Sequence, residues 1–334
     1  MKSSTRIILS FAGIIAVAAL SELCGGTDAM VTAGNEKSSK QSDASRGRDI
    51  PPESRDNKAY PCLLTFMQIS DAHVGAEDNE PIHKRLRAAV KLANSLKVDL
   101  VIDTGDIANN PVHAATEHNF QQLTKYKNYM AKLKMPYYVV PGNHDIGYFD
   151  NDKDPRKVKF ADGDILSSRF QKEIGPLDQS FVFRNYRFIL ANNNPPYGKQ
   201  PGYLSERQLA WIRHELQRAA ASNQKALLFL HVPVLDHSKN VPWGASSTKL
   251  AKLVKQYNVP LVTYGHVHEF RRAELDGTCY VMCPDLKVKG HTIVHVYRFY
   301  NNCFELWNYN VLSGKGNMVG KYDFVINDKI RSAR

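Results

Sequence analysis

Short runs of carboxylate, amide and imidazole side chains recur along this chain just after apolar segments. One run, Asn143-His144-Asp145, follows the apolar segment Tyr137–Val140 and a Pro-Gly bend, where a buried strand would leave the core. The other runs with this placement are Asp71-Ala72-His73, Gly105-Asp106, His231 and Gly265-His266-Val267-His268. Mixed oxygen and imidazole ligands without a thiolate suit Mn²⁺, Fe or Zn²⁺, so these residues are candidate metal ligands.

Each run taken singly also has an ordinary structural explanation. A histidine after a strand commonly belongs to the core or to a loop, and a Gly-Asp pair commonly forms a turn. The joint placement has no such explanation, because the carboxyl ends of strands form the edge at which α/β sheets bind ligands. We therefore expect one metal site built from five segments of the chain.

The segments between these runs predict alternating strands and helices. Strands are expected at Leu63–Ile69, Leu100–Asp103, Tyr137–Val140, Phe181–Phe183, Phe188–Ala191, Ala226–Leu230, Leu261–Tyr264, Ile293–Phe299 and Phe304–Tyr309. Helices are expected at Ile82–Leu96, Ala114–Leu133, Ser205–Ala221 and Thr248–Tyr257. Ser205 and Gln208 have the spacing of a capping box. The pattern predicts the α/β class, with antiparallel strands added by the C-terminal segment and an irregular stretch at Tyr148–Pro176.

The ordered motifs resemble those of the calcineurin-like metallophosphoesterase superfamily. They are Asp71-x-His73, Gly105-Asp106, Gly142-Asn143-His144-Asp145, His231 and Gly265-His266-x-His268, and they span residues 63 to 270. The Asp-x-His opening and the absence of a Gly-Asp-x-x-Tyr motif make the chain similar to the class III cyclic-nucleotide phosphodiesterase-like branch. The resemblance implies a four-layer α-β-β-α sandwich with its active site at the carboxyl ends of the strands.

The resemblance also implies two metal ions and divides the ligands between them. One ion would take Asp71, His73, Asp106 and His268, and the other would take Asp106, Asn143, His231 and His266. Asp106 would then bridge the pair, which offsets the repulsion of two cations about 3.5–4 Å apart. The choice among Mn, Fe and Zn stays open.

His144 receives no metal from the resemblance, and we assign it to proton donation toward the leaving group. A water held between two cations is available as hydroxide near neutral pH and could attack a phosphorus atom. The implied activity is hydrolysis of phosphate mono- or diesters, with a phosphate ester as the partner. Asp145 would be either a partner of the ligands or a residue that fixes the loop, and we expect the loop role.

Asn109 departs from the serine/threonine phosphatases, in which an Asp three residues after the bridging Asp orients the catalytic histidine. An amide stabilises an imidazolium less than a carboxylate does, which disfavours a serine/threonine-type protein phosphatase. That activity is kept as the alternative, together with an inactive domain that holds metal and binds a phosphorylated ligand. Inactive relatives usually lack a ligand or the catalytic histidine, whereas this chain has all eight residues.

The N-terminal region predicts export. Two positive charges precede a nearly continuous apolar run at Ile7–Leu20, so residues 1–23 are expected to be a signal peptide or a lipoprotein signal ahead of Cys24. Residues 24–60 are polar and are expected to form a disordered linker. Residues 61–334 would form the phosphoesterase domain, which would be periplasmic, secreted or tethered to a membrane through the N-terminus.

Composition narrows the class of partner. The chain has 334 residues, 43% of them hydrophobic, and a net charge of +11, which is compatible with one large basic domain. No helix-turn-helix, zinc-finger or aromatic RNA-binding pattern accompanies the charge, so no nucleic acid is expected, and a nuclease is supported by charge alone. Five cysteines would permit disulfides in an oxidising compartment, with one link expected between Cys279 or Cys283 and Cys303.

Three segments near the motifs could contribute to a substrate mouth. Asp236, His237 and Lys239 follow His231, although a solvated loop explains them equally well. Tyr148–Gly163 could be a lid or a surface loop. Asn192–Tyr197 could be a substrate-side loop or a cluster of turn residues.

Overall fold

The structure is a computed structural model that describes residues 61–75, 80–109, 117–146, 160–194, 202–288 and 290–324. The expected signal segment and linker therefore lie outside the described residues, as do most of Tyr148–Gly163 and the end of Asn192–Tyr197. Within the described part, no helix is both long and apolar enough to cross a membrane.

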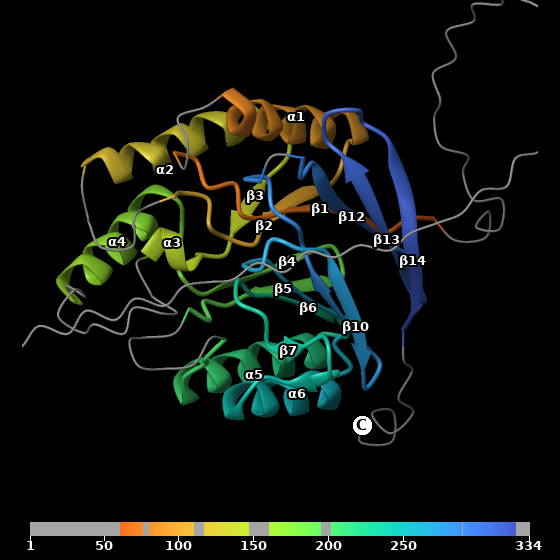
Figure 1. Cartoon of the computed structure of the whole chain (residues 1–334). Helices are drawn as coiled ribbons and strands as arrows, with labels where there is room; N and C mark the ends of the chain where they lie inside the picture. The colour runs from red at the N-terminus through yellow and green to blue at the C-terminus, as the bar shows by residue number, and fades with distance from the viewer. Residues whose placement is uncertain are drawn as a thin grey trace, which may run out of the picture. The chain divides into compact units, whose positions relative to one another are not determined.

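The strands form two six-stranded sheets and one two-stranded ribbon (Figure 1). The first sheet has the order β14-β13-β12-β1-β2-β3. Its strands are β1 Leu64–Ile69, β2 Leu100–Asp103, β3 Tyr137–Val139, β12 Ile293–Phe299, β13 Cys303–Asn310 and β14 Gly316–Asp323. The second sheet has the order β10-β11-β9-β6-β5-β4. Its strands are β4 Gln179–Phe183, β5 Tyr186–Leu190, β6 Lys225–Phe229, β9 Leu261–Tyr264, β10 Arg271–Leu275 and β11 Thr278–Met282. The ribbon pairs β7 Leu235–Asp236 with β8 Val241–Pro242.

Helices cover the outer face of each sheet, which gives the expected four layers (Figure 1). The helices are α1 Glu80–Leu96, α2 Glu117–Met130, α3 Asn143–Ile146, α4 Phe160–Glu173, α5 Glu206–Ala221 and α6 Ala245–Gln256. The first sheet packs against α1 and α2, and the second packs against α5 and α6. The predicted α-β-β-α sandwich is confirmed.

The alternation of side chains along each strand explains why three apolar layers form. On β1, Leu64 and Phe66 point between the sheets, whereas Met67 and Ile69 point toward the helices. Aromatic rings fill the space between the sheets, where Phe66 lies 5.6 Å from the ring of Phe229 in the opposite sheet. This apolar layer holds the two sheets face to face and so brings their carboxyl edges together.

The predicted helix start at Ser205 is confirmed. The Ser205 side chain accepts the backbone N–H of Gln208, and the Gln208 side chain accepts the backbone N–H of Ser205, which completes the capping box. Because both orphan N–H groups find partners, α5 begins at a defined residue directly after the loop that follows β5.

Several predicted elements differ from the structure. The expected irregular stretch Tyr148–Pro176 contains α4, whose mixed polar sequence gives a weak apolar stripe. The helix predicted at Ala114–Leu133 is seen at Glu117–Met130, and residues 110–116 lie outside the described residues. β10 and β14 were not predicted, because exposed charged and glycine-containing strands lack the alternation that marks a strand.

The disulfide expected between Cys279 or Cys283 and Cys303 is absent from the structure. Cys62, Cys279, Cys283 and Cys303 are free thiols. The physical reason is that Cys279 lies on β11 of the second sheet, whereas Cys303 lies on β13 of the first. Burial raises the pKa of the Cys279 thiol to about 12, so this side chain packs as a neutral group.

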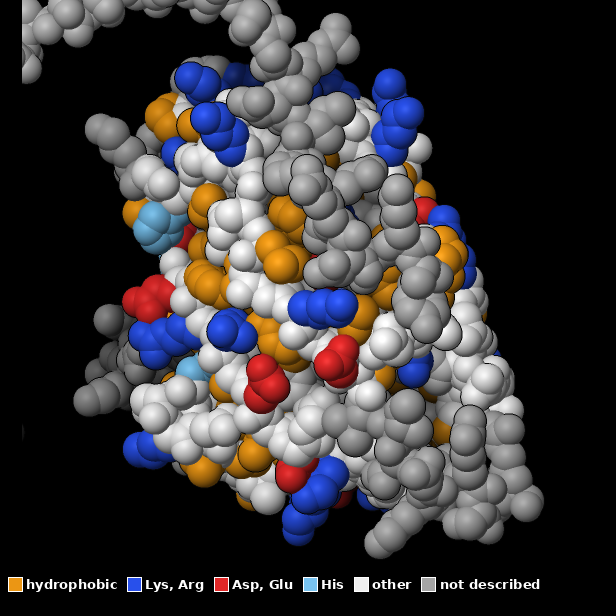
Figure 2. Space-filling view, turned by 90° about the vertical axis from the view of Figure 1, so that its right-hand side faces the viewer, with side chains coloured by type: hydrophobic (Ala, Val, Ile, Leu, Met, Phe, Trp, Pro, Cys, Tyr) orange, Lys and Arg blue, Asp and Glu red, His pale blue; other side chains and the backbone are white. Residues whose placement is uncertain are grey.

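Positive charge is spread over the face seen in Figure 2. Lys and Arg side chains lie scattered over that face, at its margin and near its centre, with hydrophobic side chains between them (Figure 2). Among the described residues of this face, the basic side chains form no continuous stripe of the kind that follows a nucleic-acid backbone.

Candidate metal centre

The candidate residues of both sheets meet at one edge of the sandwich, just past the carboxyl ends of five strands. Asp71 and His73 follow β1, Asp106 follows β2, and Asn143 begins α3 after β3. From the second sheet, His231 follows β6. His266 and His268 follow β9 of the same sheet. The parallel pairs β1–β2–β3 and β5–β6–β9 direct these loops to the same edge.

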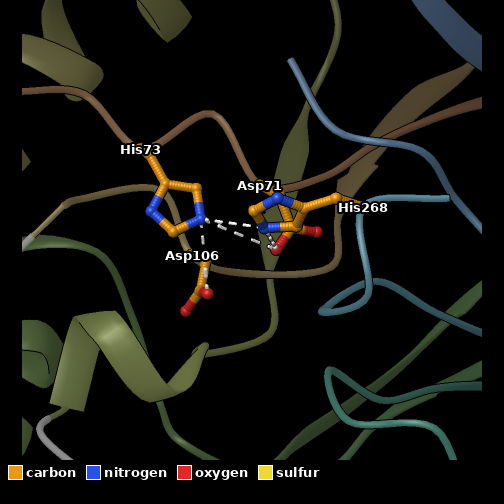
Figure 3. A group of neighbouring side chains, drawn as sticks. All are labelled: Asp71, His73, Asp106 and His268. Carbon is orange, nitrogen blue, oxygen red and sulfur yellow. Dashed lines mark hydrogen bonds and ion pairs between the residues drawn. The ribbon is translucent and has the colours of Figure 1, made fainter. Parts of the chain in front are cut away.

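The first ligand group consists of Asp71, His73, Asp106 and His268, whose ligand atoms all lie within 4.8 Å of one another. His73 Nε2 lies 3.5 Å from Asp106 Oδ2 and 3.2 Å from His268 Nε2. His268 Nε2 lies 3.2 Å from Asp71 Oδ1. Figure 3 shows the two rings and the Asp71 carboxylate facing one another. Such convergence of nitrogen and oxygen atoms is the geometry that a divalent cation requires.

The second ligand group consists of Asp106, His231 and His266, again within 4.8 Å of one another. Asn143 joins them, because its Oδ1 atom lies 3.0 Å from His231 Nε2 and 3.0 Å from His266 Nδ1. His231 Nε2 lies 3.4 Å from Asp106 Oδ2. Asp106 therefore belongs to both groups, and its Oδ2 atom lies between a histidine of each sheet.

Outer partners orient two of the ligand histidines. The Nδ1 atom of His231 lies 2.7 Å from the carbonyl oxygen of Thr104. The Nδ1 atom of His73 lies 3.1 Å from Asn109 Oδ1. Because each acceptor requires a proton on Nδ1, each ring presents the lone pair of Nε2 to the ligand group.

The charges of the groups fit a cation. Asp71 and Asp106 are both buried, and the neighbour of Asp71 Oδ1 is another candidate ligand atom, His268 Nε2, at 3.2 Å. Burial would raise the pKa of Asp106, but the charge and hydrogen bond of His231 hold that pKa well below its ordinary value. Burial would likewise lower the pKa of His231, and Asp106 raises it instead. Two buried carboxylates thus stabilise positive charge, which metal ions would supply in place of a proton.

Two glycines of the motifs are needed for close approach. A Cβ atom on Gly142 would lie 2.1 Å from the backbone nitrogen of Asp106, and one on Gly265 would lie 2.0 Å from Ser70 Oγ. Only glycine allows these loops to pack against each other at the ligand groups. This explains why a glycine precedes Asn143 and another precedes His266.

Asp145 fixes the loop that carries Asn143. Its Oδ1 atom accepts the N–H of Ala108 at 2.9 Å, and its Oδ2 atom accepts the N–H of Gly142 at 2.8 Å. Burial, followed by the neighbouring charge of Asp106, raises the pKa of Asp145 to about 7. These contacts tie the loops after β2 and β3 together, which is the loop role expected for this residue.

His144 lies beside the first group but outside both sets of ligands. Its backbone N–H donates to Asp106 Oδ1 at 2.8 Å, and its ring centroid lies 4.7 Å from that of His73. The side chain is only half-buried. A half-buried imidazole next to the ligands is placed to reach a substrate without taking a metal position.

Two positioning residues were missed by sequence reasoning. Asn193 is fully buried and accepts the backbone N–H groups of His231 at 3.1 Å and of Val232 at 3.0 Å, while its Nδ2 atom donates to Val232 O. Asn194 Nδ2 donates to Pro141 O at 2.6 Å. These asparagines connect the loop of His231 to the loop of Asn143. The only sequence signal was three consecutive asparagines after a strand.

Asp236, His237 and Lys239 form a local turn in the β7–β8 ribbon. Asp236 Oδ1 accepts the N–H groups of Ser238 and Lys239, and His237 Nε2 bonds to the Tyr264 hydroxyl. These contacts are those of a surface turn, which was one of the two explanations considered for this segment, and none of them is made to a candidate ligand.

Two adjoining ligand groups that share a carboxylate at the edge of a four-layer sandwich define a metallophosphoesterase class of hydrolase. The model of the calcineurin-like phosphoesterase family matches residues 64–270. The chain belongs to this family, and the enzyme class predicted from the motifs is confirmed. The cluster and the family together indicate two metal ions.

The relatives include phosphodiesterases. A probable glycerophosphodiester phosphodiesterase GpdQ from Arcobacter nitrofigilis is 28% identical over 217 residues, which cover 61% of this chain and 72% of that protein. The 3',5'-cyclic adenosine monophosphate phosphodiesterase CpdA from Escherichia coli K12 is 24% identical over 241 residues, which cover 68% of this chain and 77% of that protein. The predicted resemblance to the cyclic-nucleotide phosphodiesterase branch is confirmed.

Solved structures share the fold. A dimetal phosphatase from Danio rerio has a TM-score of 0.58 at 15% identity, covering 79% of this chain and 100% of that chain. Purple acid phosphatase PPD1 from yellow lupin has a TM-score of 0.56 at 14% identity, covering 78% of this chain and 53% of that chain.

Proposed function

We propose that the chain hydrolyses phosphodiesters with two metal ions held by the two ligand groups. The observation that carries this proposal is the position of Asp106, whose Oδ2 atom lies 3.5 Å from His73 Nε2 and 3.4 Å from His231 Nε2. One carboxylate is thereby shared by ligands of both sheets. Asp71, His73 and His268 would complete one metal site, and Asn143, His231 and His266 would complete the other.

The bound ions would supply a nucleophilic water near neutral pH and neutralise charge on the phosphate. The protein supplies the rest. His144 would donate a proton to the leaving oxygen, because its half-buried ring lies beside the first group while its backbone is anchored to Asp106. Asn193 and Asp145 would keep His231 and Asn143 at fixed positions, since each binds backbone atoms of a ligand loop.

The choice of diester over monoester rests on the relatives, both of which are named as phosphodiesterases. A serine/threonine-type protein phosphatase is less well supported, because Asn109 contacts His73 rather than His144. An inactive phospho-ligand binder is also less well supported, because all eight candidate residues are present, seven in the two adjoining ligand groups and His144 beside His73. Mn, Fe and Zn are the metals that we propose.

The test is hydrolysis of matched 4-nitrophenyl phosphate mono- and diesters by the full chain. We expect turnover with Mn²⁺, Fe²⁺ or Zn²⁺, none with chelator, and a faster reaction on bis(4-nitrophenyl) phosphate than on 4-nitrophenyl phosphate. A preference for the monoester would overturn the substrate class. Binding of two metal ions without turnover of either ester would favour the inactive binder.

We also propose that the protein is exported and that residues 61–334 form the catalytic domain. The charged start and the apolar run Ile7–Leu20 support export. The test is mass spectrometry of the N-terminus of the mature protein, purified from cell fractions of its native host. Cleavage near residue 23 would support a signal peptide, a lipid on Cys24 would support a tether, and an intact cytoplasmic chain would refute both.

A further inference from the structure

We propose that Asn109 is a positioning residue for His73 and sets the affinity of the first ligand group for its metal. This inference rests on the metal-binding part of the proposed function and does not require turnover. It assigns to Asn109 a different target from that of the Asp found at this place in serine/threonine phosphatases.

The contact that carries the inference joins Asn109 Oδ1 to His73 Nδ1 at 3.1 Å. An amide oxygen can only accept a hydrogen bond, so the proton of a neutral His73 must reside on Nδ1. The lone pair of His73 then lies on Nε2, which is the atom that faces Asp106 Oδ2 at 3.5 Å and His268 Nε2 at 3.2 Å. Asn109 therefore selects the tautomer that can bind a metal.

Asn109 is itself held in place. Its backbone N–H donates to Val74 O at 3.2 Å and to Gln122 Oε1 at 2.9 Å. Gln122 is a buried residue of α2, and it packs so closely on Gly75 that a Cβ atom there would lie 2.6 Å from its side chain. α2 therefore fixes Asn109, and Asn109 fixes the ring of His73.

The backbones of the loops after β1 and β2 are joined as well. His73 N–H donates to Asp106 O at 2.9 Å, and Val74 N–H donates to Ile107 O at 2.9 Å. Because these bonds pair the two loop backbones, they keep Asn109 close to His73. From its place on these paired loops, the Asn109 side chain contacts the ring of His73.

The chemical consequence follows from the neutrality of the amide. A carboxylate hydrogen-bonded to a ligand histidine increases the basicity of the ring, and changes to such outer partners typically alter metal affinity by about 10–100-fold. With an amide in this place, His73 is a weaker donor than it would be with a carboxylate. The first ligand group should therefore bind its metal less tightly than the same four ligands with an Asp at position 109.

The experiment measures Mn²⁺ affinity by isothermal titration calorimetry on the full chain at pH 8. We expect Asn109→Asp to raise the affinity of one site by about 10-fold and Asn109→Ala to lower the affinity of the same site by about 10-fold or more. The other site should change less than about 3-fold. Repeating the titrations in a His231→Ala background, which removes a ligand of the second group and none of the first, identifies the responding site as the first.

The matched control is Asn185→Asp. Asn185 lies in the turn between β4 and β5, at the opposite end of β5 from the metal centre, and donates to Asn223 O. The Asn185→Asp substitution adds the same charge as Asn109→Asp without contacting a ligand, so the Mn²⁺ affinities of both sites should stay at the wild-type value. An equal rise in this variant would attribute the effect to overall charge and overturn the proposal.

Turnover separates the two possible targets of Asn109. If Asn109→Asp leaves both metal affinities unchanged but shifts the pH–rate profile, the residue acts on His144 and the proposal is wrong. If the wild-type chain binds two Mn²⁺ ions without turning over either ester, the proposed function fails, whereas the affinity changes above would still support the role of Asn109.

A second measurement needs no variant at position 109. The ¹⁵N spectrum of the metal-free wild-type chain should show His73 as the tautomer protonated on Nδ1, with the signal assigned by its loss in His73→Ala. Protonation of a neutral His73 on Nε2 would contradict the contact with Asn109 and overturn the proposal, whether or not the Asn109 variants fold.

Discussion

The side-chain oxygen of Asn193 lies 3.1 Å from the backbone nitrogen of His231, and it accepts the N–H of Val232 as well. A ligand histidine of the second group is thus held by a residue that is not itself a ligand. Asn193→Ala leaves two buried N–H groups without an acceptor, which should lower the free energy of unfolding by about 1–3 kcal/mol. It should also weaken the second metal site by about 10–100-fold.

Urea denaturation and Mn²⁺ titration of the full chain check these two effects. Asn185→Ala, at the other end of β5, serves as the matched control because its hydrogen bond is made to an exposed turn. Wild-type affinity of both sites in Asn193→Ala would show that the loop of His231 keeps its shape without Asn193.

Asp106→Asn tests the shared carboxylate. The substitution keeps the shape of the side chain but removes the charge on which both ligand groups depend, so binding of the second equivalent of metal should be lost. Turnover should fall by more than about 10–100-fold, which is the loss typical when a residue that hydrogen-bonds to a metal ligand is changed. Metal content after dialysis and the rate on bis(4-nitrophenyl) phosphate are the measurements. Asp276→Asn, in the exposed turn between β10 and β11, is the control, and two tightly bound ions in Asp106→Asn would refute the bridging role.

His144→Ala should separate metal binding from chemistry. Because His144 lies outside both ligand groups, both metal affinities should stay within about 3-fold of wild type. The rate should fall about 10²–10⁴-fold, which is the usual contribution of a general acid. The loss should be larger for an alkyl than for a nitrophenyl leaving group, because only the alkoxide requires a proton. Equal losses on both leaving groups, or a near-wild-type rate, would be incompatible with proton donation.

The buried carboxyl of Asp103 predicts a pH dependence of stability. Burial raises its pKa well above the ordinary value, despite hydrogen bonds from the Tyr126 hydroxyl at 2.7 Å and from the Gly105 N–H at 2.9 Å. The folded chain therefore keeps a proton that the unfolded chain releases near pH 4. Stability should fall as the pH rises from about 4 toward the folded pKa, by about 1.4 kcal/mol per pH unit from this group.

Asp103→Asn removes this titration while keeping an acceptor oxygen for the Gly105 N–H, and its NH₂ group can donate to the Tyr126 hydroxyl oxygen in place of the bond that Tyr126 donates to Asp103. Relative to wild type, the variant should gain stability steadily as the pH rises above about 4. Urea denaturation in chelator from pH 4 to pH 8 measures the difference. A constant difference across this range would mean that Asp103 is ionised in the folded chain throughout.

Strongly patterned elements could be predicted from the sequence. Leu100–Asp103, Leu261–Tyr264 and Ile293–Phe299 have the predicted bounds in the structure, because each is short and rich in apolar, aromatic or β-branched residues. The candidate ligands could be grouped for a related reason, since parallel strands place their carboxyl ends at one edge. The local sequence pattern was sufficient to predict an element where contacts with the rest of the fold did not alter its bounds.

Tertiary contacts decided what could not be predicted. Asn193 has the composition of a turn residue, and only the position of β5 beside β6 makes it a partner of His231. Asn109 occupies a place linked by resemblance to a catalytic histidine, yet the loops after β1 and β2 bring it to His73. α4 has no clear apolar stripe, so its helix depends on contacts that the sequence does not display.

Asp71, His73, Asp106, His266 and His268 all have positive φ angles, between 44° and 73°. Residues with a Cβ atom are strained in this region, at a cost of about 1–2 kcal/mol each. Selecting variants for thermal stability without metal should therefore enrich glycine at these five positions and abolish the activity in the same step. The most stable form of this fold and the functional form would be different sequences, and the trade-off between them would be concentrated in the ligands themselves.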